Sequence, residues 1–338
     1  MQLPGGENRG VLYILDELLK TLEPSRKNMK FFPEEILFVP TTKCNLKCPH
    51  CNVKQSDELM PRSLALKFLK DGKRQGINKI GFTGGEPFLA LDFLINIVKA
   101  AVAQKMWFDR ITTNAVWFKN RTALEKALTE LYRAGYDGNL SISMDSFHNQ
   151  KIEKVLLFIR TAVKIFNRPD LIFLVYTAGD DNGKTQQKLK RLSALLKTKF
   201  HKGYLKNRFL FIKTLKIDLS PVGKAETLAN PWNGHWFKED YCQGPGNIFY
   251  VMPNGDVYPC CGYATDLDIK RRLIIGNIKR NTVSEIMQNV KRNRFVSAIF
   301  HSGLSKIRKR LEDRGFRFPG KTSSHCYFCY YILTHVLE

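Results

Sequence analysis

No apolar run in the 338-residue sequence approaches the roughly 18 residues that a membrane-spanning helix needs. The first residues, MQLPGGENRG, also lack the basic segment followed by an apolar stretch that marks a secretory signal. We therefore expect a soluble, cytoplasmic protein with no membrane partner. The length suits one large domain or two domains of ordinary size.

Cysteine is absent from the middle of the chain, between Cys51 and Cys242. The cysteines cluster instead near the two ends: Cys44, Cys48, Cys51, Cys242, Cys260, Cys261, Cys326 and Cys329. Disulfide frameworks belong mostly to short secreted chains, so this clustering favours metal binding. The first cluster, CNLKCPHC, lacks the fourth cysteine that a structural zinc site would use. Three thiolates would leave one coordination position of a metal centre open.

Acidic residues are absent from residues 183–217, which contain many lysines and arginines, and the formal net charge of the chain is +23. A second basic region covers residues 270–321. Both regions suit an acidic partner, such as nucleic acid or an acidic peptide, although a solvated basic surface has the same composition. Paired carboxylates and a nucleophile triad do not stand out in the sequence.

Apolar periodicity between residues 35 and 217 predicts strands that alternate with helices. The expected strands are residues 35–40, 78–87 with its glycine turn, 108–114, 139–145, 171–177 and 208–217. The expected helices are residues 63–75, 91–104, 122–134, 152–166 and 185–198. This alternation predicts a parallel sheet with helices on the outside. Six strands are fewer than a closed barrel has, so we expect an open, partial barrel with its functional residues at the carboxyl ends of the strands.

The composition changes after the last expected strand. Residues 219–237 are rich in Pro, Gly and Asn and are expected to be irregular. In the segment CQGPGNIFYVMPNGDVYPCC, Asn254 and Gly255 predict a β-hairpin that returns Cys260 toward Cys242. The later CYFC motif adds two further cysteines. Four such ligands would fit zinc or an iron–sulfur cluster equally well.

Two motifs together resemble the signature of the radical S-adenosylmethionine (SAM) superfamily. They are the three-cysteine motif CxxxCxxC and, one strand later, FTGGEP at residues 82–87. The resemblance implies that Cys44, Cys48 and Cys51 hold a [4Fe–4S] cluster, whose fourth iron binds the amino and carboxylate groups of SAM. It also implies reductive cleavage of SAM to a 5′-deoxyadenosyl radical, which abstracts a hydrogen atom from the substrate.

The same resemblance implies a set of SAM-binding residues at the ends of the second, third and fourth expected strands. These are Gly84, Gly85, Glu86, Pro87, Thr113, Asn114, Ser143 and Asp145. The glycines would let the backbone approach a ligand, and Glu86 would bind the SAM ammonium group. Ser143 and Asp145 would bind the ribose or the carboxylate, unless they are ordinary polar strand ends. His50 is expected to pack near the adenine, and His148 either faces the cleft or is structural.

The segments MPNGDVYPCC and IIGNIKRNTVSEIM look like the auxiliary-cluster extension of these enzymes, called SPASM or, in its shorter form, twitch. SPVGKAE also matches a segment often seen at the end of such barrels. The full SPASM form carries more cysteines and two extra clusters, whereas this region has only five cysteines. It therefore fits the twitch form, with one auxiliary [4Fe–4S] cluster. The implied ligands are Cys242, Cys260, Cys326 and Cys329.

The fold that the resemblance implies is α/β. It is a partial (β/α)6 TIM-like barrel of the radical SAM type with a small C-terminal α+β auxiliary-cluster domain. Residues 36–220 would form the barrel and residues 221–338 the auxiliary-cluster domain. Residues 1–35 would form an N-terminal extension, in which residues 11–22 are expected to be an amphipathic helix.

Cys261 is left over by this assignment, and three interpretations stay open. It replaces Cys260 as a ligand, it is a buried small residue, or it is a hydrogen-atom donor. A donor thiol beside the second cluster would suit a redox-neutral reaction such as peptide epimerisation, in which the substrate radical must be quenched.

The leading prediction is a radical SAM enzyme that modifies a ribosomally synthesised peptide or protein. An acidic leader of that peptide would bind the basic face, and a reductase or flavodoxin-type protein would donate the electron. The alternatives are oxidation of a small-molecule alcohol and RNA modification, and only the basic regions support a nucleic-acid partner. The non-enzyme alternative is a zinc-bearing nucleic-acid-binding module, which would need neither an open metal position nor the GGEP motif.

Overall fold

The computed structural model describes most of the chain between residues 31 and 336. The described ranges are 31–178, 183–201, 203–219, 221, 223–228, 230–232, 234–237, 242, 245–261 and 273–336. The expected helix at residues 11–22, and with it most of the predicted N-terminal extension, lies outside the described residues. No helix of the described ranges is long and apolar enough to cross a membrane.

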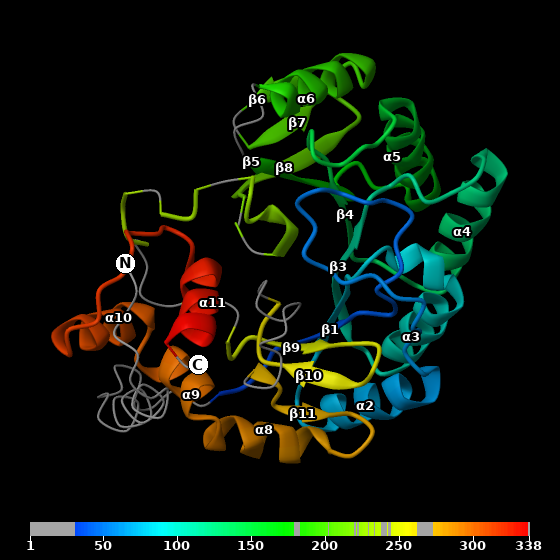
Figure 1. Ribbon diagram of the computed structural model, residues 1–338. Coiled ribbons are helices and arrows are strands. Elements are labelled where there is room, and N and C mark those ends of the chain that lie inside the picture. The colour runs from blue at the N-terminus through cyan, green and yellow to red at the C-terminus, as the bar shows by residue number, and fades with distance from the viewer. Residues whose placement is uncertain are drawn as a thin grey trace.

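Six parallel strands form the centre of the molecule, in the order expected from the sequence (Figure 1). They are β1 (Glu35–Phe38), β2 (Lys79–Phe82), β3 (Trp107–Thr113), β4 (Asn139–Ser143), β5 (Ile172–Ala178) and β8 (Phe211–Asp218). Each strand pairs in parallel with the next one along this series. The strands are connected by α2 (Arg62–Arg74), α3 (Leu91–Ala103), α4 (Arg121–Arg133), α5 (Ile152–Phe166) and α6 (Lys184–Leu195).

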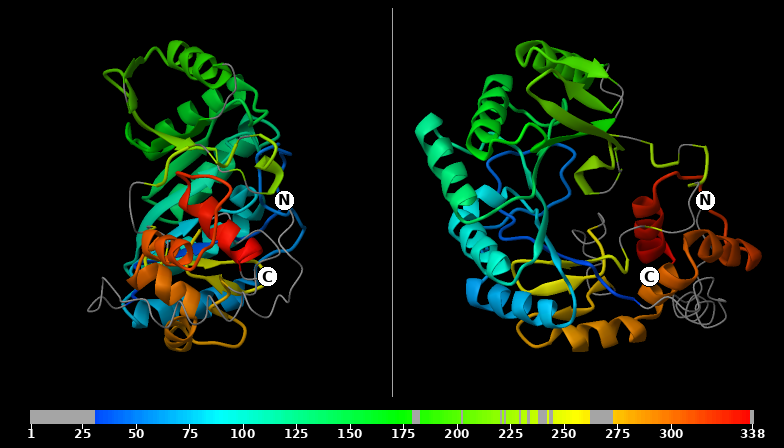
Figure 2. Two further views of the ribbon diagram at one scale, coloured as in Figure 1. Left: turned by 60° about the vertical axis from the view of Figure 1, so that its left-hand side comes forward. Right: turned by 180° about the vertical axis from the view of Figure 1, so that it is seen from behind.

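The helices lie along the outer side of the curved sheet, which does not close on itself (Figures 1 and 2). The helix α4 shows why these segments are helical. Leu124, Leu128 and Leu131 recur at helical spacing and are completely buried. The side chain of Asn120 caps the first turn by accepting a hydrogen bond from the backbone N–H of Ala123 at 2.9 Å. The predicted open, partial barrel is confirmed.

The structure contains a hairpin that the sequence pattern did not predict. Strands β6 (Lys199–His201) and β7 (Tyr204–Lys206) pair antiparallel, and β7 pairs antiparallel with β8. The prediction of one helix followed directly by one strand was therefore incomplete at this point. Both added strands are only three residues long and mostly polar, so they lack the apolar alternation by which strands are recognised.

The second half of the chain extends the barrel sheet at its other edge. Strand β9 (Ile248–Val251) pairs in parallel with β1, β10 (Asp256–Tyr258) returns antiparallel to β9, and β11 (Gly276–Asn277) pairs with β10. The predicted Asn254–Gly255 hairpin turn is confirmed, and Gly255 has a φ of +91°. In the described residues the sheet has the order β11-β10-β9-β1-β2-β3-β4-β5-β8-β7-β6.

Among the described residues, four helices complete the C-terminal part of the structure. They are α8 (Val283–Arg292), α9 (Arg294–His301), α10 (Leu304–Asp313) and α11 (His325–His335). Because β9 joins the barrel sheet directly, the predicted division of the chain at residue 220 is crossed by continuous strand pairing. The division into a barrel and an auxiliary-cluster domain stays a prediction.

Candidate active site

The three cysteines of the first motif lie in a loop that follows β1. Two threonines hold the base of this loop. The hydroxyl of Thr41 donates to the carbonyl oxygen of Glu58 at 2.9 Å, and the hydroxyls of Thr42 and Ser56 lie 2.8 Å apart. Cys48 is buried, and the other two cysteines are half-buried.

These cysteines line a cavity of about 260 Å³ at the carboxyl ends of the parallel strands. Parallel strands end at the same edge of a sheet, so motifs that are far apart in the sequence meet here. The predicted residues that line the cavity are Cys44, Cys48, Cys51, Gly84, Gly85, Thr113, Asn114, Ser143 and Asp145. His50 and His148 line it as well, whereas the predicted Glu86 and Pro87 do not.

Gly84 and Gly85 also allow the end of β2 to approach the cysteine loop. Gly84 has a φ of +134°, and a Cβ on it would lie 2.6 Å from the carbonyl oxygen of Thr41. A Cβ on Gly85 would lie 2.2 Å from the carbonyl oxygen of Lys43. The glycines therefore position the backbone just before Cys44, in addition to bordering the cavity, and the sequence analysis missed this contact.

Glu86 lies beneath the cavity and is completely buried. Its carboxylate accepts hydrogen bonds from the backbone N–H of Asn114 at 2.7 Å, the hydroxyl of Thr113 at 2.9 Å and the backbone N–H of Phe88 at 3.2 Å. Burial raises the pKa of Glu86 to about 7. The carboxylate therefore ties the end of β2 to the end of β3, and its predicted contact with SAM stays a prediction. Pro87 is also buried, at the first position of a short 3-10 helix.

The amide of Asn114 links the end of β3 to the cysteine loop. Its nitrogen donates to the side-chain oxygen of Asn45 at 2.7 Å and lies 3.7 Å from the sulfur of Cys44. Its oxygen accepts from the backbone N–H of Val116 at 2.9 Å. Asn114 thus supports a cysteine of the loop directly.

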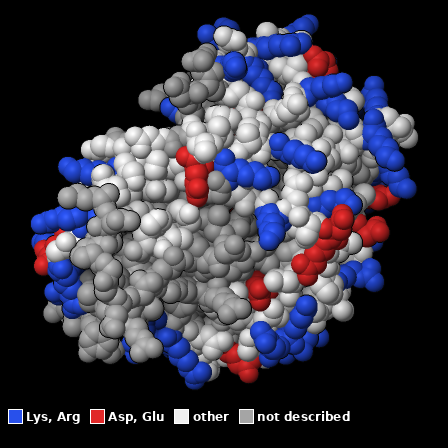
Figure 3. All heavy atoms as spheres, viewed as in Figure 1, with Lys and Arg blue, Asp and Glu red and all other residues white. Residues whose placement is uncertain are grey.

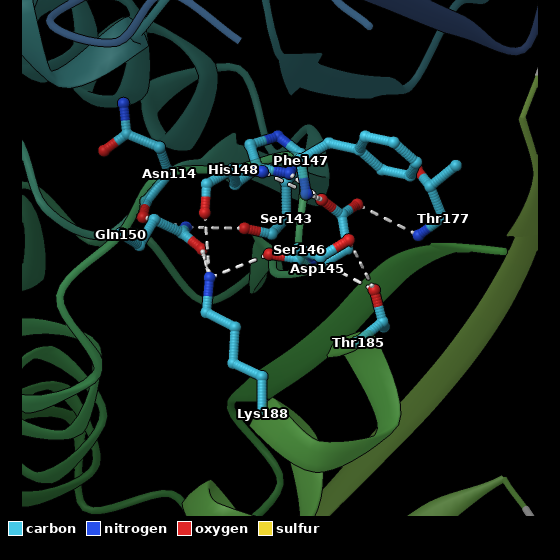
Figure 4. A network of polar contacts seen from close by, with 10 residues as sticks. All are labelled: Asn114, Ser143, Asp145, Ser146, Phe147, His148, Gln150, Thr177, Thr185 and Lys188. Atoms are coloured by element: carbon cyan, nitrogen blue, oxygen red, sulfur yellow. Dashed lines mark hydrogen bonds and ion pairs between the residues drawn. The ribbon is translucent and has the colours of Figure 1, made fainter. Parts of the chain in front are cut away.

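Asp145 holds the imidazole of His148 in the cavity wall (Figure 4). One carboxylate oxygen accepts from the backbone N–H groups of Phe147 and His148, both at 3.0 Å, and lies 2.7 Å from His148 Nδ1. The other oxygen accepts from the backbone N–H of Thr177 at 3.0 Å. Burial alone would raise the pKa of Asp145, but the hydrogen bond and charge of His148 outweigh it and hold that pKa well below its usual range. Because protein groups occupy both oxygens, His148 is the member of this pair best placed to meet a ligand.

Lys188, on α6, fixes the loop that carries Asp145 and His148 (Figure 4). Its ammonium group donates to the carbonyl oxygens of Asp145 and His148, both at 2.8 Å, and to the side chain of Gln150 at 3.2 Å. The amide nitrogen of Gln150 donates in turn to the carbonyl oxygens of Asn114 at 2.6 Å and of Ser143 at 2.7 Å. Sequence analysis did not identify either residue, because both act through contacts that no local pattern reveals.

The cavity walls contain polar groups that suit a bound cofactor. Nδ1 of His50 and the amide nitrogen of Asn52 are buried and make no hydrogen bond within the described residues. Such groups are costly to leave unpaired, so they indicate a polar ligand. The rings of His50 and His148 lie edge to face with centroids 4.6 Å apart. These features fit a nucleoside such as SAM in the cavity.

The thiols also suit a metal centre. Burial and the two neighbouring cysteines raise the pKa of Cys48 to about 12, and burial raises the pKa of Cys44. Thiols such as these two are poorly disposed to ionise by themselves, whereas a cationic centre reverses this preference and holds them as thiolates. The donor set therefore fits an iron–sulfur cluster.

A second group of cysteines meets in the C-terminal part of the structure. Cys242, Cys260, Cys326 and Cys329 line one small apolar cavity of about 30 Å³. Burial, followed by the charges of Cys326 and Cys242, raises the pKa of Cys329 well above its usual value. Cys242 before β9, Cys260 after β10 and the two cysteines in the first turn of α11 thus line the same cavity.

Cys261 does not line this small cavity, although Cys242 lies close enough for its charge to raise the pKa of the Cys261 thiol. It lines a different cavity of about 770 Å³ inside the barrel, which also contacts Glu35, Lys79, Asp109 and Arg110. The protein around Cys261 desolvates its thiol and raises its pKa to about 11, although the residue is exposed to the open cavity. The walls of this cavity and of the three-cysteine cavity share residues of the loop and the strand ends: Asn52, Val53, Thr83, Gly84 and Thr112.

The family model of the radical SAM superfamily matches residues 38–182, which include the three-cysteine loop and most of its cavity. Residues 38–182 therefore form a radical SAM domain. A second family model, the SPASM iron–sulfur cluster-binding domain, matches residues 242–314. The two domains confirm the predicted family, its enzymatic nature and its cofactors, which are SAM, a SAM-binding [4Fe–4S] cluster and an auxiliary iron–sulfur centre.

Curated relatives match this radical SAM chain to different extents. It is 23% identical over 305 residues to the putative peptide biosynthesis protein YydG of Bacillus subtilis, which covers 85% of this chain and 88% of the relative. It is 31% identical over 121 residues to GTP 3′,8-cyclase of Clostridium botulinum and to molybdenum cofactor biosynthesis protein 1 of Drosophila melanogaster. Those two matches span 34% of this chain, and only 36% and 20% of the respective relatives.

Solved structures confirm the fold. The structure of native anSMEcpe with bound AdoMet has a TM-score of 0.54 at 17% identity, and covers 90% of this chain and 98% of that one. Native anSMEcpe with bound AdoMet and Cp18Cys peptide has a TM-score of 0.53 at 16% identity over the same shares. At these identities the likeness concerns the fold alone, which is that of a radical SAM partial barrel.

Proposed function

We propose that this radical SAM enzyme modifies a ribosomally synthesised peptide and that Cys261 donates a hydrogen atom to the substrate radical. The position of Cys261 is the observation that carries the proposal. Its thiol lines the large barrel cavity, which adjoins the three-cysteine cavity, while Cys260 lies with the second cysteine group. A substrate residue in the barrel would therefore lie between the SAM-binding site and the Cys261 thiol.

Two likenesses support a peptide as the substrate class. YydG, which matches over most of its length, is named as a putative peptide biosynthesis protein. The similar fold of anSMEcpe has been solved with a bound peptide. The cavity of about 770 Å³ has the size of an ordinary ligand pocket and can accept a residue together with its backbone.

The proposal assigns a role to each group of site residues. Cys44, Cys48 and Cys51 hold the first cluster, and Cys242, Cys260, Cys326 and Cys329 hold the auxiliary cluster. The first cluster and SAM, when bound, supply a 5′-deoxyadenosyl radical. Gly84, Gly85, Thr113, Asn114 and Ser143 border SAM. Asp145 orients His148 toward it, and Glu86 holds the strand ends in register.

The proposed reaction inverts the configuration at the Cα atom of one residue of the peptide. Removal of the Cα hydrogen of that residue gives 5′-deoxyadenosine and a carbon-centred radical. The S–H bond of Cys261 then breaks homolytically, and its hydrogen atom forms a new C–H bond on the opposite face. This leaves a thiyl radical on Cys261, which one electron and one proton return to the thiol. A flavodoxin-type reductase supplies the electron, and solvent in the open cavity supplies the proton.

Anaerobic turnover in D2O tests the role of Cys261. The reconstituted enzyme would be given SAM, dithionite and a set of short synthetic peptides. We expect 5′-deoxyadenosine, and a peptide that gains one deuterium at Cα, because the Cys261 thiol exchanges with solvent. The Cys261→Ala variant should keep its iron and still form 5′-deoxyadenosine, but should add no deuterium at an inverted residue.

Three outcomes would contradict parts of this proposal. Deuterium at an inverted residue in the Cys261→Ala product would remove the donor role of Cys261. A product that has lost two hydrogens would favour oxidation, as in the alternative with a small-molecule alcohol. Absence of 5′-deoxyadenosine with the wild-type enzyme would refute the radical chemistry itself. The Cys326→Ala variant is a control, because it should lose iron whereas Cys261→Ala should not.

A further inference from the structure

One face of the β6–β7–β8 sheet carries aromatic and basic side chains together. In the antiparallel register, Lys199 lies opposite Lys206, and His201 lies opposite Tyr204. Tyr204 lies opposite Lys213, and Lys206 lies opposite Phe211. Directly opposite residues point to the same face of a sheet. We call this face the ledge, and it consists of Lys199, His201, Tyr204, Lys206, Phe211 and Lys213.

The rings of the ledge form a continuous strip. The ring centroids of His201 and Tyr204 are 5.1 Å apart with an interplanar angle of 29°, and those of Tyr204 and Phe211 are 5.5 Å apart at 30°. The three lysines around this strip are exposed. The ledge therefore offers flat apolar surface bordered by positive charge.

The opposite face is buried in β7 and β8, whereas Phe200, on that face of β6, is 40% exposed. Leu205 and Ile212 alternate with the ledge residues and are completely buried. Helix α6 contacts β5 and β6, and Figure 1 shows α6 beside β6 and β7. The ledge is thus the side of these strands opposite the buried Leu205 and Ile212, and on it His201 is exposed while Tyr204 and Phe211 are half-buried.

The ledge continues directly into the SAM cavity along β8. Leu215 and Ile217 follow Lys213 on the same face, because side chains two apart in a strand point the same way. Leu215 is 44% exposed, and Ile217 lines the three-cysteine cavity. Four residues of extended strand span roughly 13 Å. In one extended peptide, the residue bound on the ledge would therefore lie about four residues from the residue in the cavity.

The charged side chains contributed by this segment of the chain are all basic. Residues 183–217 contain no acidic residue. Within the described residues, Lys199, Lys206 and Lys213 take part in no ion pair. Basic side chains also predominate over this end of the molecule in Figure 3. Acidic side chains of a partner would thus find unneutralised lysines beside the aromatic strip.

We propose that the ledge binds an acidic segment of the peptide substrate, about four residues along the chain from the residue that enters the cavity. This inference rests on the proposed peptide substrate. Glutamate or aspartate side chains of the segment pair with the three lysines, and its apolar or aromatic side chains lie on the strip of His201, Tyr204 and Phe211. The ledge thereby selects which residue of the peptide reaches the SAM site.

A matched pair of charge-reversal variants tests the ledge. Lys206→Glu/Lys213→Glu changes two lysines of the ledge. Lys184→Glu/Lys190→Glu makes the same change in charge at exposed lysines of α6, on the other side of these strands. The probe is a fluorescein-labelled peptide of alternating glutamate and tyrosine, measured by fluorescence anisotropy with the reconstituted, SAM-loaded enzyme. A peptide with glutamine in place of glutamate is the comparison.

We expect the wild-type enzyme to bind the glutamate peptide. The ledge variant should bind it roughly tenfold more weakly, since two attractive ion pairs become repulsive, and the α6 variant less than about twofold more weakly. Both variants should retain dithionite-driven formation of 5′-deoxyadenosine without peptide. That reaction tests the radical chemistry separately from the ledge.

Several results would overturn the inference. If both variants weakened binding of the glutamate peptide equally, the peptide would be attracted by the overall positive charge of the protein and not by the ledge. Equal binding of the glutamine peptide, or no binding of either peptide by the wild-type enzyme, would exclude an acidic segment as the occupant. Tighter binding of a labelled oligouridine than of the glutamate peptide, lost in the ledge variant, would assign the ledge to RNA instead.

Discussion

Replacing Gly85 by alanine should displace the cysteine loop while the barrel stays folded. A Cβ at this position would lie 2.2 Å from the carbonyl oxygen of Lys43 and 2.4 Å from that of Thr42. Contacts of a Cβ below 3.0 Å are essentially never observed, so the loop must retreat by about 0.8 Å, the difference from 2.2 Å. Both of these atoms belong to the backbone, so no side-chain rotation relieves the clash.

This displacement of the loop should lower both the stability of the protein and the rate of SAM cleavage. It strains two backbone hydrogen bonds, from Gly85 N–H to Thr41 at 3.1 Å and from Glu86 N–H to Lys43 at 2.8 Å. Each such bond contributes about 1 kcal/mol, and overpacking adds about 1–3 kcal/mol, so the stability should fall by about 3–5 kcal/mol if both bonds are lost. A shift of about 1 Å in a catalytic group can lower a rate roughly 100-fold.

Iron content, thermal melting and the rate of 5′-deoxyadenosine formation with dithionite would be compared in the reconstituted proteins. The Gly203→Ala variant is the control. Gly203 also has a positive φ, of +89°, but a Cβ there would meet nothing within 4 Å. The Gly203→Ala variant should lose some stability because of backbone strain, yet should cleave SAM at the wild-type rate. A Gly85→Ala enzyme with wild-type rate and stability would refute the role assigned to this close approach.

Three further changes test other parts of the site. Because burial raises the pKa of Glu86 from 4.5 to about 7, the folded chain keeps a proton that the unfolded chain loses, and stability falls as the pH rises through this window. The free energy of unfolding of the metal-free chain would be measured with urea near pH 5 and near pH 8. Glu86→Gln should reduce the difference between these two free energies by up to about 3 kcal/mol. An unchanged difference would contradict the raised pKa of Glu86. Lys188→Met removes three hydrogen bonds from the loop after β4 and should weaken SAM binding about tenfold in equilibrium dialysis, with partial recovery in Lys188→Arg; wild-type affinity in Lys188→Met would exclude this positioning role. Cys260→Ala should lower the iron content from about eight to about four atoms per chain, whereas Cys261→Ala should leave it unchanged; the reverse result would exchange their roles.

Much of this architecture could be predicted from local patterns. The six parallel strands were expected because alternation of apolar strands with helices of period 3.6 is a local property of the sequence. The cavity was expected at their carboxyl ends because Cys44, Gly84, Asn114 and Asp145 each follow a strand closely. The resemblance to radical SAM enzymes added the cofactors, which spacing alone did not identify.

Other features could not be predicted, because they depend on contacts between distant segments. The hairpin of β6 and β7 has too few apolar residues to be recognised, and only its pairing with β8 makes it a strand pair. The roles of Lys188 and Glu86 arise from their acceptors and donors on neighbouring elements. Burial of the Glu86 carboxylate, and hence its raised pKa, is likewise a property of the assembled barrel.

The adjacent residues Cys260 and Cys261 illustrate what could not be predicted from the sequence by itself. It determined that three thiols follow β1 and that a hairpin ends in two cysteines, because spacing and turn residues are local. Which of the two cysteines lines the small cavity with Cys242, and which lines the barrel cavity, depends on the pairing of β9 with β1. That pairing places the hairpin against the barrel, and neighbouring side chains at its end then enter different cavities.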